Sequence, residues 1–333
     1  MVCERQAGME NSPLHLLVLP PPEPGAGEIR VRIRACGVCR TDLHVIEGDL
    51  PSRKLPIVPG HQVVGVVDQK GRLTSKFKKG DRVGIAWLRS TCGQCEDCRR
   101  GNENLCEMSR YTGYDADGGY AEYAVVPEPY AYRIPDRFKE DEAAPLLCAG
   151  IIGFRAFKRC DVGPGARLGL FGFGSSAHIT IQVARHLECE VYVSTRGAKH
   201  RKLASDLGAR WVGEADEIPP VKLDAAILFA PVGNLVPPAL RSLGKGGRLV
   251  SAGIHLTTIP EMTYKEHFFH EKVFTSVESN TRRDGEELLT LAAKIPVRAR
   301  VEIFPLDEAN RALLLLKQGA IEGTAVLVPS SNS

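Results

Sequence analysis

The chain has 333 residues, 43% of them hydrophobic, and its 43 basic and 40 acidic side chains give a formal charge of +3. This length suggests about two domains with real apolar cores, and the composition excludes a disordered chain. Because the basic residues are dispersed among acidic ones, no dedicated nucleic-acid surface is expected. The start lacks a basic segment followed by an apolar one, and no run approaches the roughly 18 apolar residues of a membrane span. We therefore expect a cytoplasmic protein without a membrane partner.

The first part of the chain is rich in short strand patterns separated by Pro and Gly. Strands are predicted over residues 28–38, 61–69, 81–88, 118–126 and 131–135. Frequent turn residues between short β-type runs are typical of a twisted, barrel-type β domain. This interpretation covers about the first 150 residues.

From about Ala166 the pattern changes to strands alternating with helices. Strands are predicted over 166–174, 190–196, 223–230, 247–253 and 272–277, with helices over 175–187, 198–208 and 236–244. This alternation predicts a parallel, doubly wound sheet.

After about Glu278 the prediction is two helices, 284–295 and 307–319, and two strands, 299–306 and 323–329, a tail long enough to return to the first domain. The fold class is therefore α/β, with a β-barrel-type domain over 1–149, a doubly wound domain over 150–278 and a C-terminal segment over 279–333. Only the end, residues 329–333, is expected to be frayed.

Four cysteines, Cys92, Cys95, Cys98 and Cys106, follow a C-x2-C-x2-C-x7-C spacing. Such a spacing brings four thiolates within the roughly 2.3 Å reach of one tetrahedral zinc ion, in a closed and therefore structural site. Disulfide pairing of the ten cysteines is the alternative, but four cysteines in one polar loop favour a metal and a reducing compartment. A zinc ribbon alone can bind DNA, but this one interrupts a larger domain.

Three further residues, Cys39, His61 and Cys148, suggest a second metal site. Two sulfurs and one imidazole leave the fourth position of a zinc ion open, so the ion could act as a Lewis acid. Each residue taken singly has a simpler interpretation, because a buried cysteine is often a small hydrophobe and a histidine a satisfied core residue.

Gly172, Gly174 and Ala177 lie between an apolar strand and a helix, where glycines let backbone N–H groups approach a pyrophosphate. At the end of the next strand, Thr195 and Arg196 stand where an NAD-binding chain usually offers a carboxylate. An arginine can instead pair with a 2′-phosphate, supported here by Lys199 and Arg201, so NADP is favoured over NAD. The alternative is that these cations form only a solvated helix start.

The motifs CRTDLH, GHQVVGVV, the cysteine lobe, LLCAG and GFGSSA occur in an order that resembles the zinc-dependent alcohol dehydrogenases of the medium-chain family. The resemblance covers the whole chain and is closest to the microbial, usually tetrameric branch, which also has a Trp-Leu step, here Trp87 and Leu88. It implies a GroES-like catalytic domain joined to a Rossmann domain, and a tetramer or dimer. It also implies two zinc ions per chain, a catalytic one on Cys39, His61 and Cys148 and a structural one on Cys92, Cys95, Cys98 and Cys106.

The remaining roles combine this resemblance with chemistry. Thr41 is expected to take the proton of the substrate and pass it, through the nicotinamide ribose, to His44. Asp42 is expected to accept a hydrogen bond from His61 and so fix its tautomer. Thr41 and Asp42 also suit a helix N-terminus, and both interpretations can hold together. Cys36 is interpreted as packing, and Gln62 departs from the glutamate that usually follows the ligand histidine.

The resulting prediction is an alcohol dehydrogenase that prefers NADP and interconverts a primary or secondary alcohol with an aldehyde or ketone. Trp87, Leu88 and Tyr111 are candidates for the pocket wall or for the core. The alternatives are a polyol or other specialised dehydrogenase of the same family and a catalytically silent binding protein on the same fold. A zinc-free quinone or enoyl reductase would lack Cys39, His61 and Cys148 together.

Overall fold

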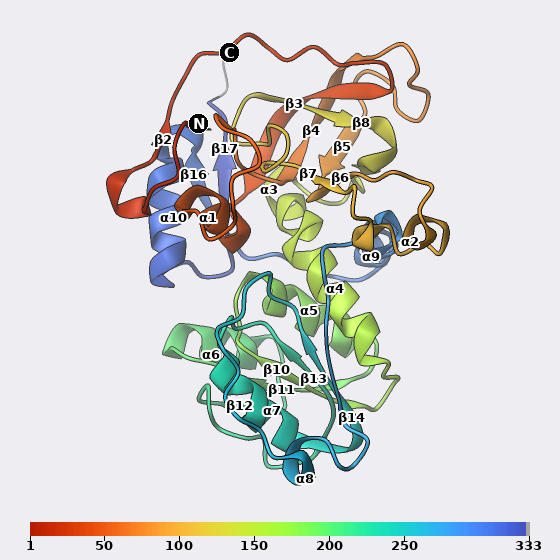
Figure 1. Ribbon diagram of the computed structural model, residues 1–333, viewed down its shortest axis with the longest axis vertical. Helices are drawn as coiled ribbons and strands as arrows, with labels where there is room; N and C mark the ends of the chain where they lie inside the picture. The colour runs from red at the N-terminus through yellow and green to blue at the C-terminus, as the bar shows by residue number, and fades with distance from the viewer. Residues whose placement is uncertain (331–333) are drawn as a thin grey trace. The chain divides into compact units, whose positions relative to one another are not determined.

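The computed structural model describes residues 1–330 and divides into two compact units (Figure 1). The first unit comprises Met1–Cys148, Ser279–Ala293 and the chain from Ala299 onward, and the second comprises Ala149–Glu278 with Lys294–Arg298. The predicted tail is thus divided, because Lys294–Arg298 groups with the second unit. Residues 331–333 of the predicted frayed end lie outside the described residues.

The first unit is built on a seven-stranded, mainly antiparallel sheet in which the C-terminal β17 lies beside the N-terminal β3 (Figure 1). Its strand order is β16 (Val301–Pro305), β17 (Thr324–Val328), β3 (Glu28–Gly37), β4 (Gln62–Lys70), β5 (Arg82–Ile85) and β9 (Ala131–Arg133), with β8 (Tyr123–Pro127) also paired to β3. The register shifts between Arg30 and Val31 and again between Ile33 and Ala35 mark irregular points along β3, where a strand bends. One long, bent strand can in this way pair with three neighbours.

Two small two-stranded sheets and five helices complete the described part of the first unit. The antiparallel pairs are β1 (Val2–Cys3) with β2 (Leu14–His15), and β6 (Leu88–Ser90) with β7 (Arg110–Tyr111). The helices are α1 (Arg40–Glu47), α2 (Glu96–Arg99), α3 (Glu140–Ala143), α9 (Arg282–Lys294) and α10 (Ala309–Gln318). Short 3-10 turns are η1 (Met9–Asn11), η2 (Glu103–Leu105), η3 (Glu128–Tyr130), η4 (Ala144–Leu147) and η6 (Leu306–Glu308).

Two strand predictions for this unit need correction. The strand expected over 81–88 ends at Ile85, and Leu88 begins β6 in a different sheet. The strand expected over 118–126 begins only at Tyr123, because residues 118–120 instead run along the backbone of residues 58–60.

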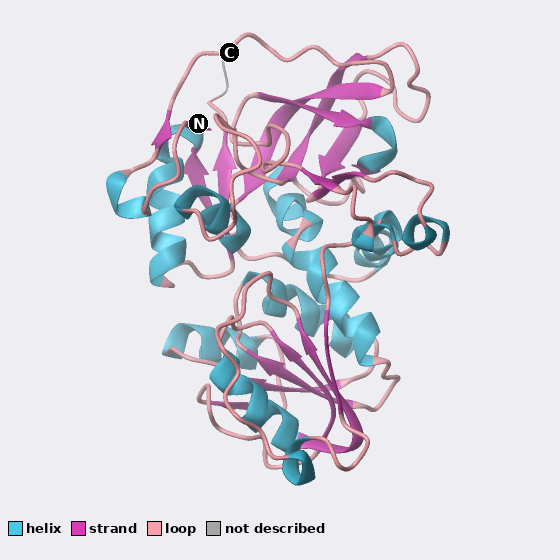
Figure 2. Ribbon diagram, viewed as in Figure 1, coloured by secondary structure: helices cyan, strands magenta, loops and turns pink. Residues whose placement is uncertain are grey.

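The second unit holds a six-stranded sheet whose neighbouring strands are all parallel (Figure 2). Its order is β12 (Trp211–Gly213), β11 (Glu190–Ser194), β10 (Arg167–Phe171), β13 (Leu223–Leu228), β14 (Leu243–Ser251) and β15 (Val273–Ser276). The first strand along the chain is therefore central, with the next two strands on one side and the last three on the other. This is the doubly wound order, and in sheets of this order ligands typically bind outside the carboxyl ends of the strands where the order reverses, here β10 and β13.

Side chains of the central strands alternate between the two faces of the sheet, so the core of this unit forms two clusters. Leu168 and Leu170 of β10 join one cluster and Phe171 the other. The first cluster includes residues of α4 (Ala149–Cys160), α5 (Ser175–His186) and α6 (Ala198–Asp206), and the second those of α7 (Val236–Ser242). Helices thus cover both faces of the sheet, which confirms the predicted α/β class. The unit also contains η5 (Gly233–Leu235) and α8 (Tyr264–His267).

Among residues 1–330, no helix has both the length and the apolar character needed to span a membrane.

Candidate functional site

Cys39 is held at the start of α1 by a capping arrangement. Its sulfur accepts the backbone N–H of Thr41 at 3.5 Å, and its own N–H donates to Asp42 Oδ2 at 2.9 Å. The strand β3 ends at Gly37, and Cys39 is the extended residue that directly precedes the helix. Capping therefore fixes both the backbone and the sulfur of Cys39.

The structure brings Cys39, His61 and Cys148 together. Their sulfur and nitrogen atoms all lie within 4.8 Å of one another, with Cys39 Sγ 3.9 Å from Cys148 Sγ and His61 Nε2 3.3 Å from Cys148 Sγ. Sulfurs bound to one tetrahedral zinc ion at about 2.3 Å are about 3.8 Å apart, so this geometry fits a single zinc ion. Three ligands of this kind leave one position for a substrate oxygen.

Asp42 orients the fully buried ring of His61, because Asp42 Oδ1 lies 3.0 Å from His61 Nδ1 and leaves Nε2 toward the sulfurs. Burial lowers the pKa of His61, but the charge and hydrogen bond of Asp42 outweigh it and raise this pKa to about 10. The carboxylate is itself buried, 1% exposed. The predicted contact between Asp42 and His61 is present, and so is the predicted capping.

The two thiols of this cluster have pKa values shifted in opposite directions. The hydrogen bond from Cys148 lowers the pKa of Cys39 well below its ordinary value, and the same contact together with burial raises the pKa of Cys148. A divalent cation bound at this cluster would displace the protons that its ligands still carry.

Thr41 and His44 lie on the first two turns of α1 and are half-buried. The hydroxyl of Thr41 is 3.6 Å from Cys39 Sγ, which puts it beside the metal-binding cluster. His44 Nδ1 lies 2.8 Å from Asp49 Oδ2, an interaction that the sequence did not predict. Asp49 lies just beyond the helix, and an acidic residue five positions after a histidine carries no specific signal.

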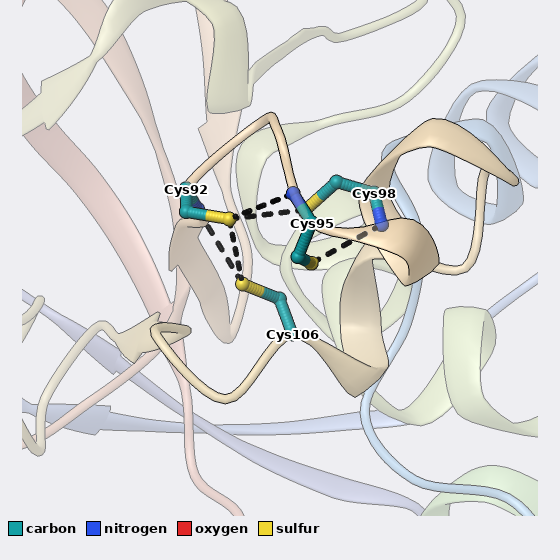
Figure 3. Close-up of side chains that lie close together, drawn as sticks. All are labelled: Cys92, Cys95, Cys98 and Cys106. Atoms are coloured by element: carbon teal, nitrogen blue, oxygen red, sulfur yellow. Dashed lines mark hydrogen bonds between the residues drawn. The ribbon is translucent and has the colours of Figure 1, made fainter.

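The second cysteine cluster is formed within one loop that contains α2 and η2 (Figure 3). Cys92 Sγ lies 3.9 Å from Cys98 Sγ and 3.5 Å from Cys106 Sγ, again close to the edge of a zinc tetrahedron. Backbone N–H groups of Gln94 and Cys95 lower the pKa of Cys92 to about 6. All four sulfurs lie within 4.8 Å of one another, so this closed set can hold a structural zinc ion.

An aromatic cluster flanks the ring of His61. Trp87 meets it edge-on at 4.9 Å between ring centroids, and Tyr111 and Tyr114 stack on Trp87 at 4.9 and 5.9 Å. All three aromatic side chains are less than 10% exposed, so they pack as core around the ligand histidine.

In the second unit, the turn after β10 has the geometry of a phosphate loop. Gly172 has a φ of +92°, and a Cβ there would lie 2.9 Å from the backbone nitrogen of Ala230, so the position requires glycine. Gly174 begins α5, and a Cβ at Gly174 would meet no atom within 4 Å. Ala177 is fully buried in α5. The loop thus leaves open space at a helix N-terminus, where a pyrophosphate can bind.

The residues expected beside the ribose follow β11, on the neighbouring strand end. Thr195 is buried, whereas Arg196 and Lys199 are exposed at the start of α6. Arg201, predicted as a supporting cation, is instead 2.5 Å from Glu214 and is therefore neutralised in part. Arg196 and Lys199 remain as the cations available to a phosphate.

Besides Asp49, Tyr120 is a residue near the cluster that the sequence does not predict. It is fully buried, and its hydroxyl donates to Asp42 Oδ2 at 3.0 Å. It lies 78 positions from Asp42 within a stretch that reads as an ordinary strand, so no local pattern reveals the contact.

Comparison with known proteins gives the family. Residues 25–136 match the family described as alcohol dehydrogenase GroES-like domain. The chain is 53% identical to "Probable alcohol dehydrogenase AdhA" of Mycobacterium tuberculosis, over 97% of this chain and 95% of that protein. It is 36% identical to an alcohol dehydrogenase of Geobacillus stearothermophilus, over 95% and 96%.

A solved structure supports the same family assignment. A cobalt- and zinc-bound thermostable alcohol dehydrogenase from Pyrobaculum aerophilum superposes with a TM-score of 0.88 at 26% identity, over 97% of both chains. The first unit is accordingly GroES-like and the second is a Rossmann domain, as the sequence predicted. The chain belongs to the zinc-dependent alcohol dehydrogenases of the medium-chain family.

Proposed function

We propose that this chain interconverts a primary or secondary alcohol with the corresponding aldehyde or ketone, using a zinc ion held by Cys39, His61 and Cys148. The observation that carries the proposal is the convergence of two sulfurs and one imidazole within 4.8 Å in a donor set that leaves one position open. A zinc ion in that set supplies Lewis-acid polarisation of a substrate oxygen, and the nicotinamide cofactor exchanges the hydride.

The proton of the alcohol needs a separate acceptor, and we assign that role to Thr41. Its hydroxyl, 3.6 Å from Cys39 Sγ, is within reach of an oxygen bound beside that sulfur. His44 is the proposed end of the relay, and its Nδ1 lies 2.8 Å from Asp49 Oδ2. Asp42 is not a member of the proposed relay and holds His61 in place.

A second zinc ion, on Cys92, Cys95, Cys98 and Cys106, completes the proposed metal content of two per chain. A closed sulfur set offers no position to a substrate, so this ion contributes only to folding. Gln62, which is buried, cannot supply the negative charge of the glutamate usual at that position. The three ligands do not depend on that charge.

NADP is the proposed preferred cofactor. Two features support it: no carboxylate follows β11 to repel a 2′-phosphate, and the exposed Arg196 and Lys199 can pair with one. NAD use is the alternative, in which these cations are only solvated.

We also propose an oligomeric state and a cellular location. A homotetramer or homodimer is supported by the open edge strand β15 of the parallel sheet, which a second copy can extend. A reducing, cytoplasmic location is supported by the ten cysteines of the described residues, all of them free thiols and seven of them in the two metal-binding clusters.

The direct test is a spectrophotometric screen of alcohols and carbonyl compounds with NADP and NAD. The proposal expects turnover of simple alcohols or aldehydes with the NADP rate dominant. Turnover confined to polyols would favour the specialised dehydrogenase. Absence of turnover across the panel, in protein that contains zinc, would favour the catalytically silent binding protein.

A further inference from the structure

Tyr120 belongs to a segment that is laid directly against the chain preceding His61. The N–H of Gly119 donates to the carbonyl of Gly60 at 2.8 Å, and the N–H of Tyr120 donates to the carbonyl of Pro59 at 2.9 Å. These two backbone hydrogen bonds fix residues 59–60, immediately before the ligand histidine, to the segment that carries Tyr120.

The ring of Tyr120 packs on the backbone of Gly60. A Cβ at Gly60 would lie 2.4 Å from Cδ1 of this ring, and Gly60 has a φ of +96°, so no other residue fits there. The ring of Tyr120 therefore occupies the space that a side chain at Gly60 would fill. Its packing limits how far the backbone of His61 can shift.

The hydroxyl of Tyr120 reaches past Gly60 to Asp42. It donates to Asp42 Oδ2 at 3.0 Å, the same oxygen that accepts the N–H of Cys39 at 2.9 Å, while Oδ1 faces His61. Tyr120 is 0% and Asp42 1% exposed, so water does not compete for this oxygen. Burial and the charge of Asp42 raise the pKa of Tyr120 well above its ordinary value, so the hydroxyl keeps its proton and remains a donor.

We propose that Tyr120 is a positioning residue of the catalytic zinc site, acting through Asp42. With donors on both oxygens, the carboxylate cannot rotate away from His61 Nδ1, and Nε2 of the ring stays directed at the metal. The proposal rests on the proposed function, since it assumes zinc at Cys39, His61 and Cys148. Partners behind a metal ligand typically change metal affinity by about 10- to 100-fold when they are removed.

The first test is Tyr120→Phe, which keeps the ring on Gly60 and removes only the hydroxyl. The matched control is Tyr132→Phe, because Tyr132 is also buried, 3% exposed, and its hydroxyl has a polar partner, Asn280 at 3.2 Å, outside the metal-binding cluster. The measurement is the rate at which each zinc-loaded protein releases zinc to an excess of a chromogenic chelator, with thermal unfolding recorded in parallel.

Zinc release is expected in two phases, and Cys39→Ser identifies the one that belongs to the catalytic site by deleting it. Tyr120→Phe should accelerate that phase by about 10-fold or more and leave the other unchanged, whereas Tyr132→Phe should change neither. If the rate of the catalytic-site phase stays within twofold of the parent, or if both phases accelerate equally, the positioning role of Tyr120 is wrong. If Cys39→Ser removes no phase, the proposed function fails instead.

The second test uses Asp42→Asn as background and does not depend on the stability of Tyr120→Phe alone. If Tyr120 acts through the charge of Asp42, adding Tyr120→Phe to Asp42→Asn should change the catalytic zinc-release rate by less than about twofold. A further acceleration as large as in the parent background would mean that Tyr120 acts independently of Asp42, and the proposal would be wrong.

Discussion

Asp42 accepts three hydrogen bonds, from the backbone of Cys39, the ring of His61 and the hydroxyl of Tyr120. A buried carboxylate is costly unless each oxygen finds donors, and here the donors are two residues of the Cys39, His61 and Cys148 cluster and Tyr120. Asp42 therefore caps α1 and orients the ring of His61. The first two contacts follow from short motifs, but Tyr120 comes from a distant segment whose approach depends on the complete fold.

Thr41 is the residue on which proton transfer depends in the proposed scheme. In the parent, the Thr41 hydroxyl lies 3.6 Å from Cys39 Sγ. Thr41→Ser keeps a hydroxyl at this position and should retain substantial activity. Thr41→Ala removes the proton acceptor and should lower kcat by roughly 10²-fold, the scale of general acid–base catalysis. Steady-state rates of both variants, with zinc content measured as a control, check this. Equal rates for the two variants would exclude Thr41 from the relay.

Arg196 is the residue that decides the cofactor in the proposed function. Arg196→Ala should raise the KM for NADP by about tenfold to hundredfold and hardly change that for NAD, since a charge-assisted pair contributes about 1.5–3 kcal/mol. The control is Arg210→Ala, because Arg210 is also exposed but pairs with Glu190 at the opposite end of β11. A parent enzyme that already uses NAD better than NADP would contradict the assignment.

The helices and strands that the sequence predicts correctly have a regular hydrophobic pattern along their whole length. The incorrect strand boundaries lie where the chain turns sharply. The strands and helices of the Rossmann domain follow from alternating patterns with Gly at their ends. Residues 83–88 of the 81–88 run carry no polar side chain, so nothing there signals that Ile85 ends one strand and Leu88 starts a strand in another sheet. The helix α4 and the strand β12 were not predicted, because α4 contains two glycines and β12 is short.

The turn η3 fixes the loop between β4 and β5 through one carboxylate. Glu128 is 6% exposed and accepts the N–H groups of Ser75 at 2.8 Å and Phe77 at 3.0 Å. Burial favours the neutral acid, but the donors, led by Phe77, outweigh it and lower the pKa of Glu128. The stabilisation is therefore present above the unfolded-state pKa and is lost as the pH falls through the lower folded-state pKa.

Glu128→Gln should accordingly lower the free energy of unfolding at pH 7 by roughly 1–3 kcal/mol, because one N–H loses its acceptor. The difference from the parent should shrink at acidic pH, where the parent carboxylate is also neutral. Denaturant unfolding at several pH values measures it, with Glu286→Gln, 62% exposed, as the control that should change little. A pH-independent difference would contradict the linkage.

At the scale of the whole molecule, the change from β-type runs to βα alternation near Ala166 predicted two kinds of domain, and both are present. The length of the tail predicts its return to the first domain, and the C-terminal β17 pairs there with β3. The grouping of Lys294–Arg298 with the second unit is not predicted, since five residues without a period carry no signal of their own. Strand order likewise depends on long-range pairing that local patterns do not encode.

Metal content per chain tests whether Cys39, His61 and Cys148 hold a catalytic zinc ion separate from the structural one. Cys106→Ser serves as the contrast, because loss of the structural ion should lower the midpoint of thermal unfolding. Protein purified without chelator should contain two zinc ions per chain, and Cys39→Ser should contain one, unfold at nearly the parent temperature and lack alcohol dehydrogenase activity. One zinc ion in the parent, or full activity in Cys39→Ser, would show that Cys39, His61 and Cys148 do not hold a catalytic zinc ion.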